Sequence, residues 1–330
     1  MLDNYNRDIS YLRVSITDRC NLRCIYCMPK EGLSLIGHDD ILRYEEISRI
    51  IRVAVGTGIR KIRITGGEPL TRRGVVDFIA SMKAIPGIRD ISLTTNGILL
   101  ADYAEKLFHA GIRRINISLD SLNHEKYKRI TRGGDLTDVL KGIDEVYRIG
   151  FSPIKINIVV IKGFNDSEIL DFAKLTVNKP FQIRFIELMS LGQNELDRSG
   201  KYLSNDTVGA EIRRMYKLEP VNGEKSRIDG PAKIFRIPGG AGEIGFISPL
   251  SHQFCNTCNR LRLTADGQLR VCLLSDAEVD LKKALREGCN DGQLAEMIAA
   301  AIIKKPMRHN LACDKGNIKK CVKDMSAIGG

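Results

Sequence analysis

The sequence predicts an α/β protein, a partial (βα)6 TIM-like barrel followed by a C-terminal α+β region. Two observations carry this prediction. Short β-rich segments alternate six times with longer amphipathic segments, as parallel strands joined by crossover helices do. Polar and glycine residues directly follow several of these strands, at the edge where barrel-type folds gather their chemistry. Because six units are fewer than the eight of a closed barrel, we expect one side to stay open.

The six strands are expected at Leu12–Thr17, Lys61–Thr65, Asp90–Thr94, Arg113–Leu119, Ile154–Ile161 and Gln182–Leu188. Helices are expected between them at Tyr44–Val55, Val75–Lys83, Leu100–Ala110, Leu136–Ile149 and Asp166–Val177. Gly111 and Gly150 follow two of these helices, where a glycine commonly ends a helix. Asn165 opens a segment that resembles a helix start.

The C-terminal part has a different pattern. The alternation weakens near residues 190–235, and we place a boundary near residue 220, so that residues 1–220 form the barrel and residues 221–330 a second region. This second region is predicted to contain a hairpin and two helices, at Leu261–Val271 with its turn at Asp266-Gly267, at Glu278–Arg286 and at Gln293–Ile303.

Composition limits the function. Of the 330 residues, 43% are hydrophobic, enough to bury a sizeable core. No apolar run is long enough to span a bilayer and no secretory signal is visible, so we expect a cytoplasmic protein with reduced thiols. The nine cysteines are then better interpreted as ligands, catalytic groups or buried small side chains. The net charge of +11 favours an anionic partner, either nucleic acid or a small phosphorylated or carboxylated molecule, although a basic surface that maintains solubility has the same signature.

The first cysteine triad is Cys20, Cys24 and Cys27, a C-x3-C-x2-C set in the loop after the first expected strand. Closely spaced thiolates hold iron–sulfur clusters. Three ligands on a four-iron cubane leave one iron open to a small molecule. Zinc is the alternative, although a structural zinc site usually has four ligands and no fourth lies close in the sequence.

The second cysteine triad is Cys255, Cys258 and Cys272, a C-x2-C-x13-C set around the basic segment Asn259–Arg262. The expected hairpin returns Cys272 towards the first pair, so one metal centre can hold all three. A second iron–sulfur cluster, with an open iron beside two arginines, would bind an anionic substrate. Zinc with His252 as its fourth ligand is the alternative.

The first triad resembles the signature of the radical S-adenosylmethionine (SAM) superfamily. Tyr26 is the aromatic residue common before the third cysteine, and Gly66-Gly67-Glu68-Pro69 looks like the superfamily's methionine-binding motif. With its two triads, nearly the whole chain resembles the GTP 3′,8-cyclase family, also called molybdenum cofactor biosynthesis protein A. The segments that carry this likeness are Leu12–Asp18, Cys27-Met28-Pro29, Phe254–Arg260 and the terminal Gly329-Gly330. Thr71 and Gly74 depart from the pattern, because a leucine and an acidic residue are expected there.

The resemblance implies a reaction. Two 4Fe–4S clusters and SAM would be the cofactors, and SAM would be cleaved to methionine and a 5′-deoxyadenosyl radical that takes the 3′ hydrogen of GTP. The ribose radical would then attack C8 of guanine, and an electron and a proton would complete (8S)-3′,8-cyclo-7,8-dihydroguanosine 5′-triphosphate, in the first step of molybdenum cofactor biosynthesis. The implied partners are a flavodoxin- or ferredoxin-like electron donor, a downstream cyclic pyranopterin monophosphate synthase and a second copy in a homodimer, with no nucleic acid or membrane.

The resemblance also implies site residues. Those for SAM are Tyr26, Gly67, Ser118 and Met189; those for GTP are Arg13, Arg63, Thr94, Lys155, Arg260, Leu261 and Arg262. A tail ending in Gly329 and Gly330 would enter the site and assist the radical step. The chain lacks the glycine-rich P-loop motif, so separate arginines and lysines must hold the phosphates. Taken singly, an arginine or lysine is more often a surface residue, and a methionine such as Met189 is more often packed in the core.

Two other functions stay open. One is a radical enzyme that modifies a peptide or protein, with the second triad holding an auxiliary cluster. The other is a non-catalytic, zinc-binding nucleic-acid module. The sequence argues against this module, because it shows no interleaved aromatic and basic residues of the kind that bind single strands. Cys289, Cys313 and Cys321 are expected to be free thiols, with an extra metal or redox role as the alternative.

Overall fold

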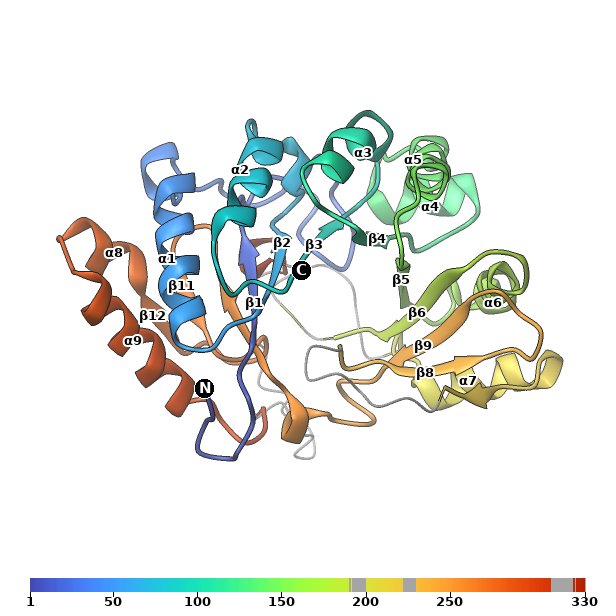
Figure 1. Cartoon of the computed structure of the whole chain (residues 1–330). Coiled ribbons are helices and arrows are strands. Elements are labelled where there is room, and N and C mark those ends of the chain that lie inside the picture. The colour runs from blue at the N-terminus through green and yellow to red at the C-terminus, as the bar shows by residue number, and fades with distance from the viewer. Residues whose placement is uncertain (190, 192–199, 222–229, 310–322, 324, 330) are drawn as a thin grey trace.

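The computed structural model describes residues 1–189, 191, 200–221, 230–309, 323 and 325–329 (Figure 1). Within them, one sheet has the strand order β12-β11-β10-β1-β2-β3-β4-β5-β6-β9-β8-β7. The six predicted strands lie side by side and pair in parallel. They are β1 (Tyr11–Ser15), β2 (Lys61–Thr65), β3 (Asp90–Thr95), β4 (Arg114–Ser118), β5 (Ile154–Val160) and β6 (Phe181–Glu187). Since the two outermost strands of this sheet do not pair with each other, the open partial barrel is confirmed.

Helices cover the outer side of these strands, as Figure 1 shows for α1 to α5. The helices of the barrel are α1 (Tyr44–Gly56), α2 (Val75–Ser81), α3 (Leu100–His109), α4 (His124–Thr131), α5 (Leu136–Ile149) and α6 (Ile169–Asn178). Gly150 ends α5 with a φ of 95°, the left-handed conformation that glycine adopts freely. None of the described helices is both long and apolar enough to cross a lipid bilayer.

The strands alternate between an apolar and a polar face. On β2, Ile62 and Ile64 are fully buried in the hydrophobic core beneath the helices, whereas Lys61 and Arg63 line a cavity on the inner side. The other central strands follow the same period of two, which is the spacing that sends successive side chains to opposite faces. The sheet therefore separates a hydrophobic core from a strongly polar interior.

The C-terminal strands lengthen both ends of the parallel sheet. β10 (Arg260–Leu263) pairs in parallel with β1, and β9 (Glu243–Ile247) pairs in parallel with β6. Antiparallel strands then continue outwards, as β11 (Gln268–Arg270), β12 (Glu278–Asp280), β8 (Lys233–Arg236) and β7 (Glu219–Pro220). The hairpin between β10 and β11 is confirmed, and it joins the barrel sheet directly. The division at residue 220 stays a prediction.

One predicted helix, at Glu278–Arg286, is wrong in detail. The segment at Glu278 begins as strand β12, and only α8 (Leu281–Arg286) is helical, because Asp280 caps that helix by accepting a hydrogen bond from the Lys283 amide. The helix start expected at Asn165 is confirmed, because a 3-10 turn at Asp166–Glu168 leads directly into α6, while the Asn165 side chain bonds main-chain groups of Asp120, Val159 and Ile161.

The sequence patterns also missed α4 and α7 (Asn205–Met215). These two helices have capping side chains, Asn123 and Ser204. The remaining helices are α9 (Asp291–Ile303), as predicted, and the short α10 (Met325–Ile328).

Candidate active site

One cavity occupies the polar inner side of the barrel and contains both cysteine triads. All six triad cysteines line it, together with Tyr26, Gly67, Ser118, Met189, Arg13, Arg63, Thr94, Lys155, Arg260 and Arg262. Leu261 is the exception among the predicted contacts, since its side chain is 1% exposed and packs in the hydrophobic core. Gly330, Cys313 and Cys321 lie outside the described residues.

The loop of the first triad is held by the end of α4. The amide of Ile25 donates to the carbonyl of Ile130 at 2.9 Å, and the Arg23 amide donates to Thr131 at 3.0 Å. Arg132, in the left-handed conformation just past α4, donates to the carbonyls of Arg23 and Met28 at 3.3 and 3.1 Å. The unpredicted helix α4 therefore fixes the backbone that presents the cysteines.

Asp120 ties the same loop to the barrel. The Tyr26 hydroxyl donates to one of its carboxylate oxygens at 2.6 Å, and the amide of Val159 on β5 donates to the other at 2.8 Å. Burial raises the pKa of Asp120 to about 6, against the lowering effect of these two hydrogen bonds. Asp120 joins β4, β5 and the cysteine loop in one network.

The thiols of the first triad do not favour ionisation by themselves. Burial raises the pKa of Cys24 well above its usual range, and the neighbouring Cys27, Asp120 and Cys20 raise it further. A positively charged iron centre would relieve both effects, so this donor set fits an iron–sulfur cluster.

A single zinc ion fits the structure poorly. Across the described ranges, no three cysteine, histidine or acidic side chains come close enough to hold one metal ion. His252 contacts Asp206 at 2.8 Å and is absent from the described lining of the cavity. The geometry therefore does not support His252 as a zinc ligand.

The Gly66-Gly67-Glu68-Pro69 motif allows two loops to approach closely. A Cβ atom on Gly67 would lie 2.3 Å from the carbonyl oxygen of Arg19, and one on Gly66 would lie 2.7 Å from that of Thr17. Glu68 then accepts hydrogen bonds from the Asn96 amide at 2.7 Å and from the Thr95 hydroxyl at 2.8 Å. Burial raises the pKa of Glu68 to about 7, although these bonds favour its ionised form.

Replacing Gly67 by alanine is expected to displace the cysteine loop and destabilise the protein by about 1–3 kcal/mol, since backbone atoms cannot move aside as a flexible side chain does. Thermal unfolding and iron content of the reconstituted protein measure this effect. Gly56→Ala is the matched control, because outside the nearby residues of α1 no described atom lies within 4 Å of the added methyl group, and α1 should become more stable by at most about 1 kcal/mol. Equal melting temperatures for Gly67→Ala and the wild type would contradict the close approach.

Cationic side chains dominate the cavity wall. Eight lysines and arginines line it, whereas Asp120 is the single carboxylate among the described lining residues; the eight are Arg13, Lys61, Arg63, Lys155, Arg184, Arg260, Arg262 and Lys305. Strand register aligns three of them, because Arg13 pairs with Arg262 on one side and with Arg63 on the other. Burial lowers the pKa of Arg13 to about 10, and the positive charge of Arg63 adds to this lowering.

Unsatisfied polar atoms in the same wall also point to a bound ligand. The Arg13 Nε, Thr94 Oγ1 and Asn157 Oδ1 atoms are buried without a hydrogen-bond partner, and all three residues line the cavity. Buried polar groups normally have partners. Donors, an acceptor and clustered cations together fit a polyanion with further polar groups.

The second triad is presented by the C-terminal strands. Cys255 and Cys258 come immediately before β10, and Cys272 follows β11. Burial opposes ionisation of Cys258, but Arg260 and Lys305 outweigh it and lower its pKa to about 6. Arg7 holds the backbone at Cys255 by donating a hydrogen bond to the Cys255 carbonyl oxygen at 2.7 Å. A thiolate stabilised in this way fits a cluster ligand.

The C-terminal tail reaches the cavity region. The carbonyl oxygen of Gly329 accepts a hydrogen bond from Arg262 at 2.5 Å. A Cβ atom on Gly329 would lie 2.8 Å from that of Ser15, and its φ of 84° also favours glycine. Ile328 is buried with Leu191 and Leu274.

The sequence-based prediction missed four charged residues of the described cavity lining, Lys61, Asp120, Arg184 and Lys305. For Lys61 and Arg184 a signal existed, because each occupies the polar phase of a strand whose other phase is apolar. Lys305 had no comparable signal, since it reaches the site through a long-range contact with the carbonyl of Arg260 at 3.0 Å.

Comparisons with known proteins agree with this geometry. The family model "Radical SAM superfamily" matches residues 14–176, and "Molybdenum Cofactor Synthesis C" matches residues 181–311. The GTP 3′,8-cyclase of Alkaliphilus oremlandii is 49% identical over 330 residues, with 100% of both chains covered. The GTP 3′,8-cyclase of Thermodesulfovibrio yellowstonii is 50% identical over 332 residues, again with 100% of both chains covered.

Solved structures support the fold. The crystal structure of Streptococcus suis SuiB bound to S-adenosylmethionine has a TM-score of 0.58 at 13% identity, covering 97% of this chain and 77% of that one. By its full-length similarity and its barrel with a SAM-type cysteine triad, the chain belongs to the GTP 3′,8-cyclase family of the radical SAM superfamily.

Proposed function

We propose that the protein converts GTP to (8S)-3′,8-cyclo-7,8-dihydroguanosine 5′-triphosphate with SAM as cosubstrate, the first step of molybdenum cofactor biosynthesis. The names of the full-length relatives support this proposal. The observation that carries it is a single cavity with two cysteine triads and a row of arginines between them.

Cys20, Cys24 and Cys27 would hold the first 4Fe–4S cluster, and Tyr26, Gly67, Ser118 and Met189 would contact SAM beside it. When bound, this pair supplies a 5′-deoxyadenosyl radical that can remove the 3′ hydrogen of the ribose. The chain's part is to orient the groups and exclude water. The Tyr26–Asp120 bond and the Glu68 contacts keep the loop in one place for that purpose.

Cys255, Cys258 and Cys272 would hold a second 4Fe–4S cluster next to the substrate. Arg260 and Lys305 stabilise the thiolate of Cys258, so they favour metal binding at this position. Arg13, Arg63, Thr94, Lys155, Arg260 and Arg262 would bind GTP. The second cluster and these contacts, like the tail's role, rest on the cavity's donor set and the family resemblance.

The cavity supplies what a triphosphate requires. Four negative charges in a water-poor site need several cations and forked donors. Without a ligand the cations repel one another. Burial, together with the nearby Arg63, lowers the pKa of Arg184 to about 9, which is one effect of this repulsion. Binding of GTP would remove this repulsion.

The electron donor, the downstream synthase, a homodimer and a cytoplasmic location stay predictions.

GTP binding is expected to take up close to one proton at pH 8 through Lys155. Burial and then Arg184 lower the pKa of Lys155 to about 6, so in the ligand-free protein this amine is largely neutral at pH 8, and the triphosphate favours its charged form. Calorimetric titration in buffers of different ionisation enthalpy measures the uptake, which Lys155→Met should abolish. The same pKa shift makes the stability of the ligand-free protein depend on pH. Because the pKa of Lys155 in the folded protein lies below its usual 10.5, the unfolded chain binds more protons, and stability rises with pH between about 6 and 10.5. Equal proton uptake by wild type and variant would contradict the assignment.

Anaerobic reconstitution with iron and sulfide tests the proposed function. The reduced protein is incubated with SAM and GTP, and both 5′-deoxyadenosine and the cyclised nucleotide are expected. ATP in place of GTP is the substrate control. Formation of 5′-deoxyadenosine with a peptide but not with GTP would favour a peptide-modifying radical enzyme instead.

A further inference from the structure

Arg63, Arg13 and Arg262 form a row of arginines across β2, β1 and β10, and the sheet edge beyond this row carries a second group of charged residues. Arg262 on β10 is in register with Arg270 on β11, which is in register with Glu278 on β12. Residues directly opposite each other on neighbouring strands point to the same face. Glu278 and Arg262 therefore lie on one face, two strands apart, a separation of roughly 10 Å.

Glu278 is held firmly in this position. Arg270 is fully buried and forms an ion pair with Glu278 as well as one with Asp276 at 3.5 Å. At the turn between β10 and β11, Asp266 accepts a hydrogen bond from the Thr264 hydroxyl. Two carboxylates are thus presented on one sheet edge, Asp266 by the β10–β11 turn and Glu278 by β12.

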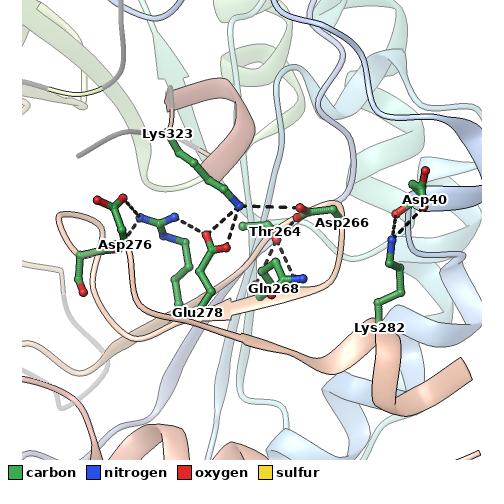
Figure 2. Close-up of polar contacts among 10 residues, drawn as sticks. Asp40, Thr264, Asp266, Gln268, Asp276, Glu278, Lys282 and Lys323 are labelled. Carbon is green, nitrogen blue, oxygen red and sulfur yellow. Dashed lines mark hydrogen bonds and ion pairs between the residues drawn. The ribbon is translucent and has the colours of Figure 1, made fainter. Parts of the chain in front are cut away.

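Lys323 spans these two carboxylates, as Figure 2 shows. Its Nζ atom lies 2.8 Å from Glu278 and 3.8 Å from Asp266. Its side chain is 34% exposed, so the amine reaches the pair from the surface. This contact joins the C-terminal segment to the β10–β11–β12 edge.

The same segment is attached a second time, six residues later. Gly329 accepts the hydrogen bond from Arg262, and Ile328 packs with Leu191 and Leu274. The one-turn helix α10 lies between these two residues along the chain. Lys323 and Gly329 are therefore fixed to the same strand row, at Glu278 and at Arg262.

We propose that Lys323 is a positioning residue that sets where the C-terminal tail enters the cavity, through its ion pair with Glu278 and Asp266. Its effect on turnover rests on the proposed function, whereas its effect on the tail does not. Because each attachment restricts the conformations of the tail, loss of the Lys323 ion pair should leave Gly329 bound to Arg262 for a smaller fraction of the time.

Hydrogen exchange of the C-terminal peptide in the reconstituted protein tests the proposal. The Gly329 amide donates to the Met325 carbonyl at 3.0 Å, so its protection reports on the docked tail. Lys323→Met is expected to speed exchange of this peptide by about two- to fivefold at low salt, as loss of a partly exposed ion pair predicts. High salt should speed exchange in the wild type and narrow the difference, since the pair is screened.

Two further variants make the comparison sharp. Lys282→Met is the matched control, because Lys282 forms an ion pair with Asp40 at 3.3 Å in the same region, away from Lys323 (Figure 2). Lys323→Arg keeps the charge and should restore wild-type exchange. Glu278 is unsuitable for this test, since its removal would leave the buried Arg270 with a weaker partner.

Turnover gives the second readout. Lys323→Met should lower the cyclised product formed per 5′-deoxyadenosine by about two- to fivefold, without changing the KM for SAM. Unchanged exchange in Lys323→Met, or equal acceleration in Lys282→Met, would overturn the positioning role. If the wild type forms no cyclised product, the proposed function fails, and the exchange measurement still decides the role of Lys323.

Discussion

Replacing Cys24 by alanine is expected to reduce formation of 5′-deoxyadenosine to below about a thousandth of the wild-type rate, because SAM cleavage depends on the first cluster. The thiol of Cys24 lies among Cys20, Cys27 and Asp120, where only a positive centre makes three ionised thiolates favourable. Anaerobic assays with SAM, GTP and a chemical reductant measure this loss.

Cys289→Ala is the control for that experiment. Cys289 follows α8, packs against the hydrophobic core and is not among the described residues that line the cavity. Its variant should keep wild-type activity and iron content. Wild-type rates of 5′-deoxyadenosine formation in Cys24→Ala would show that the first triad is not the SAM site.

Replacing Arg13 by methionine is expected to raise the KM for GTP by about 10- to 100-fold, the loss that charge-assisted hydrogen bonds to a phosphate predict. The same change should make the GTP-free protein more stable, by about 1–4 kcal/mol, because burial of the Arg13 charge beside Arg63 is unfavourable without a ligand. The pair of opposite effects distinguishes a binding residue from a structural one.

Steady-state kinetics and thermal unfolding of the reconstituted protein measure the two effects. Arg148→Met is the control, since Arg148 is exposed and forms an ion pair with Glu145 on the helical surface at 2.7 Å. A lower melting temperature in Arg13→Met, with an unchanged KM, would assign Arg13 to the fold rather than to the substrate.

The sequence was sufficient to predict the six parallel strands, because each has its own local signal of β-branched residues and a following turn. It also indicated both triads, whose spacings are short. The alternation of apolar and polar residues along the strands could have identified two more residues of the cavity. Lys61 and Arg184 share the polar phase with Arg63 and Lys155, and that phase alone would have assigned them to the cavity.

Long-range pairing explains most of what could not be predicted. No local pattern shows that β9 pairs with β6 or that β10 pairs with β1, since these partners are far apart in the chain. The same reason hides the contact of Lys323 with Glu278 and of Lys305 with Arg260. Leu261 lies between two cavity-facing arginines on a strand, so its side chain must point to the opposite face, and its predicted contact with GTP would have to come from its main chain.

Strands of the C-terminal region pair directly with the barrel sheet, and residues of this region line the same cavity. Through β10 it adds Arg260 and Arg262 beside Tyr11 and Arg13, and it brings the second triad to the same cavity. A barrel made of β1 to β6 alone would have the first triad and only part of the cationic wall.

The proposed reaction requires one cavity in which each triad holds its own cluster. Iron and sulfide content per chain, measured for the wild type, Cys24→Ala and Cys258→Ala after anaerobic reconstitution, tests this most directly. We expect about eight irons in the wild type and about four in each variant. About four irons in the wild type, with no loss in Cys258→Ala, or zinc at the second triad, would contradict it.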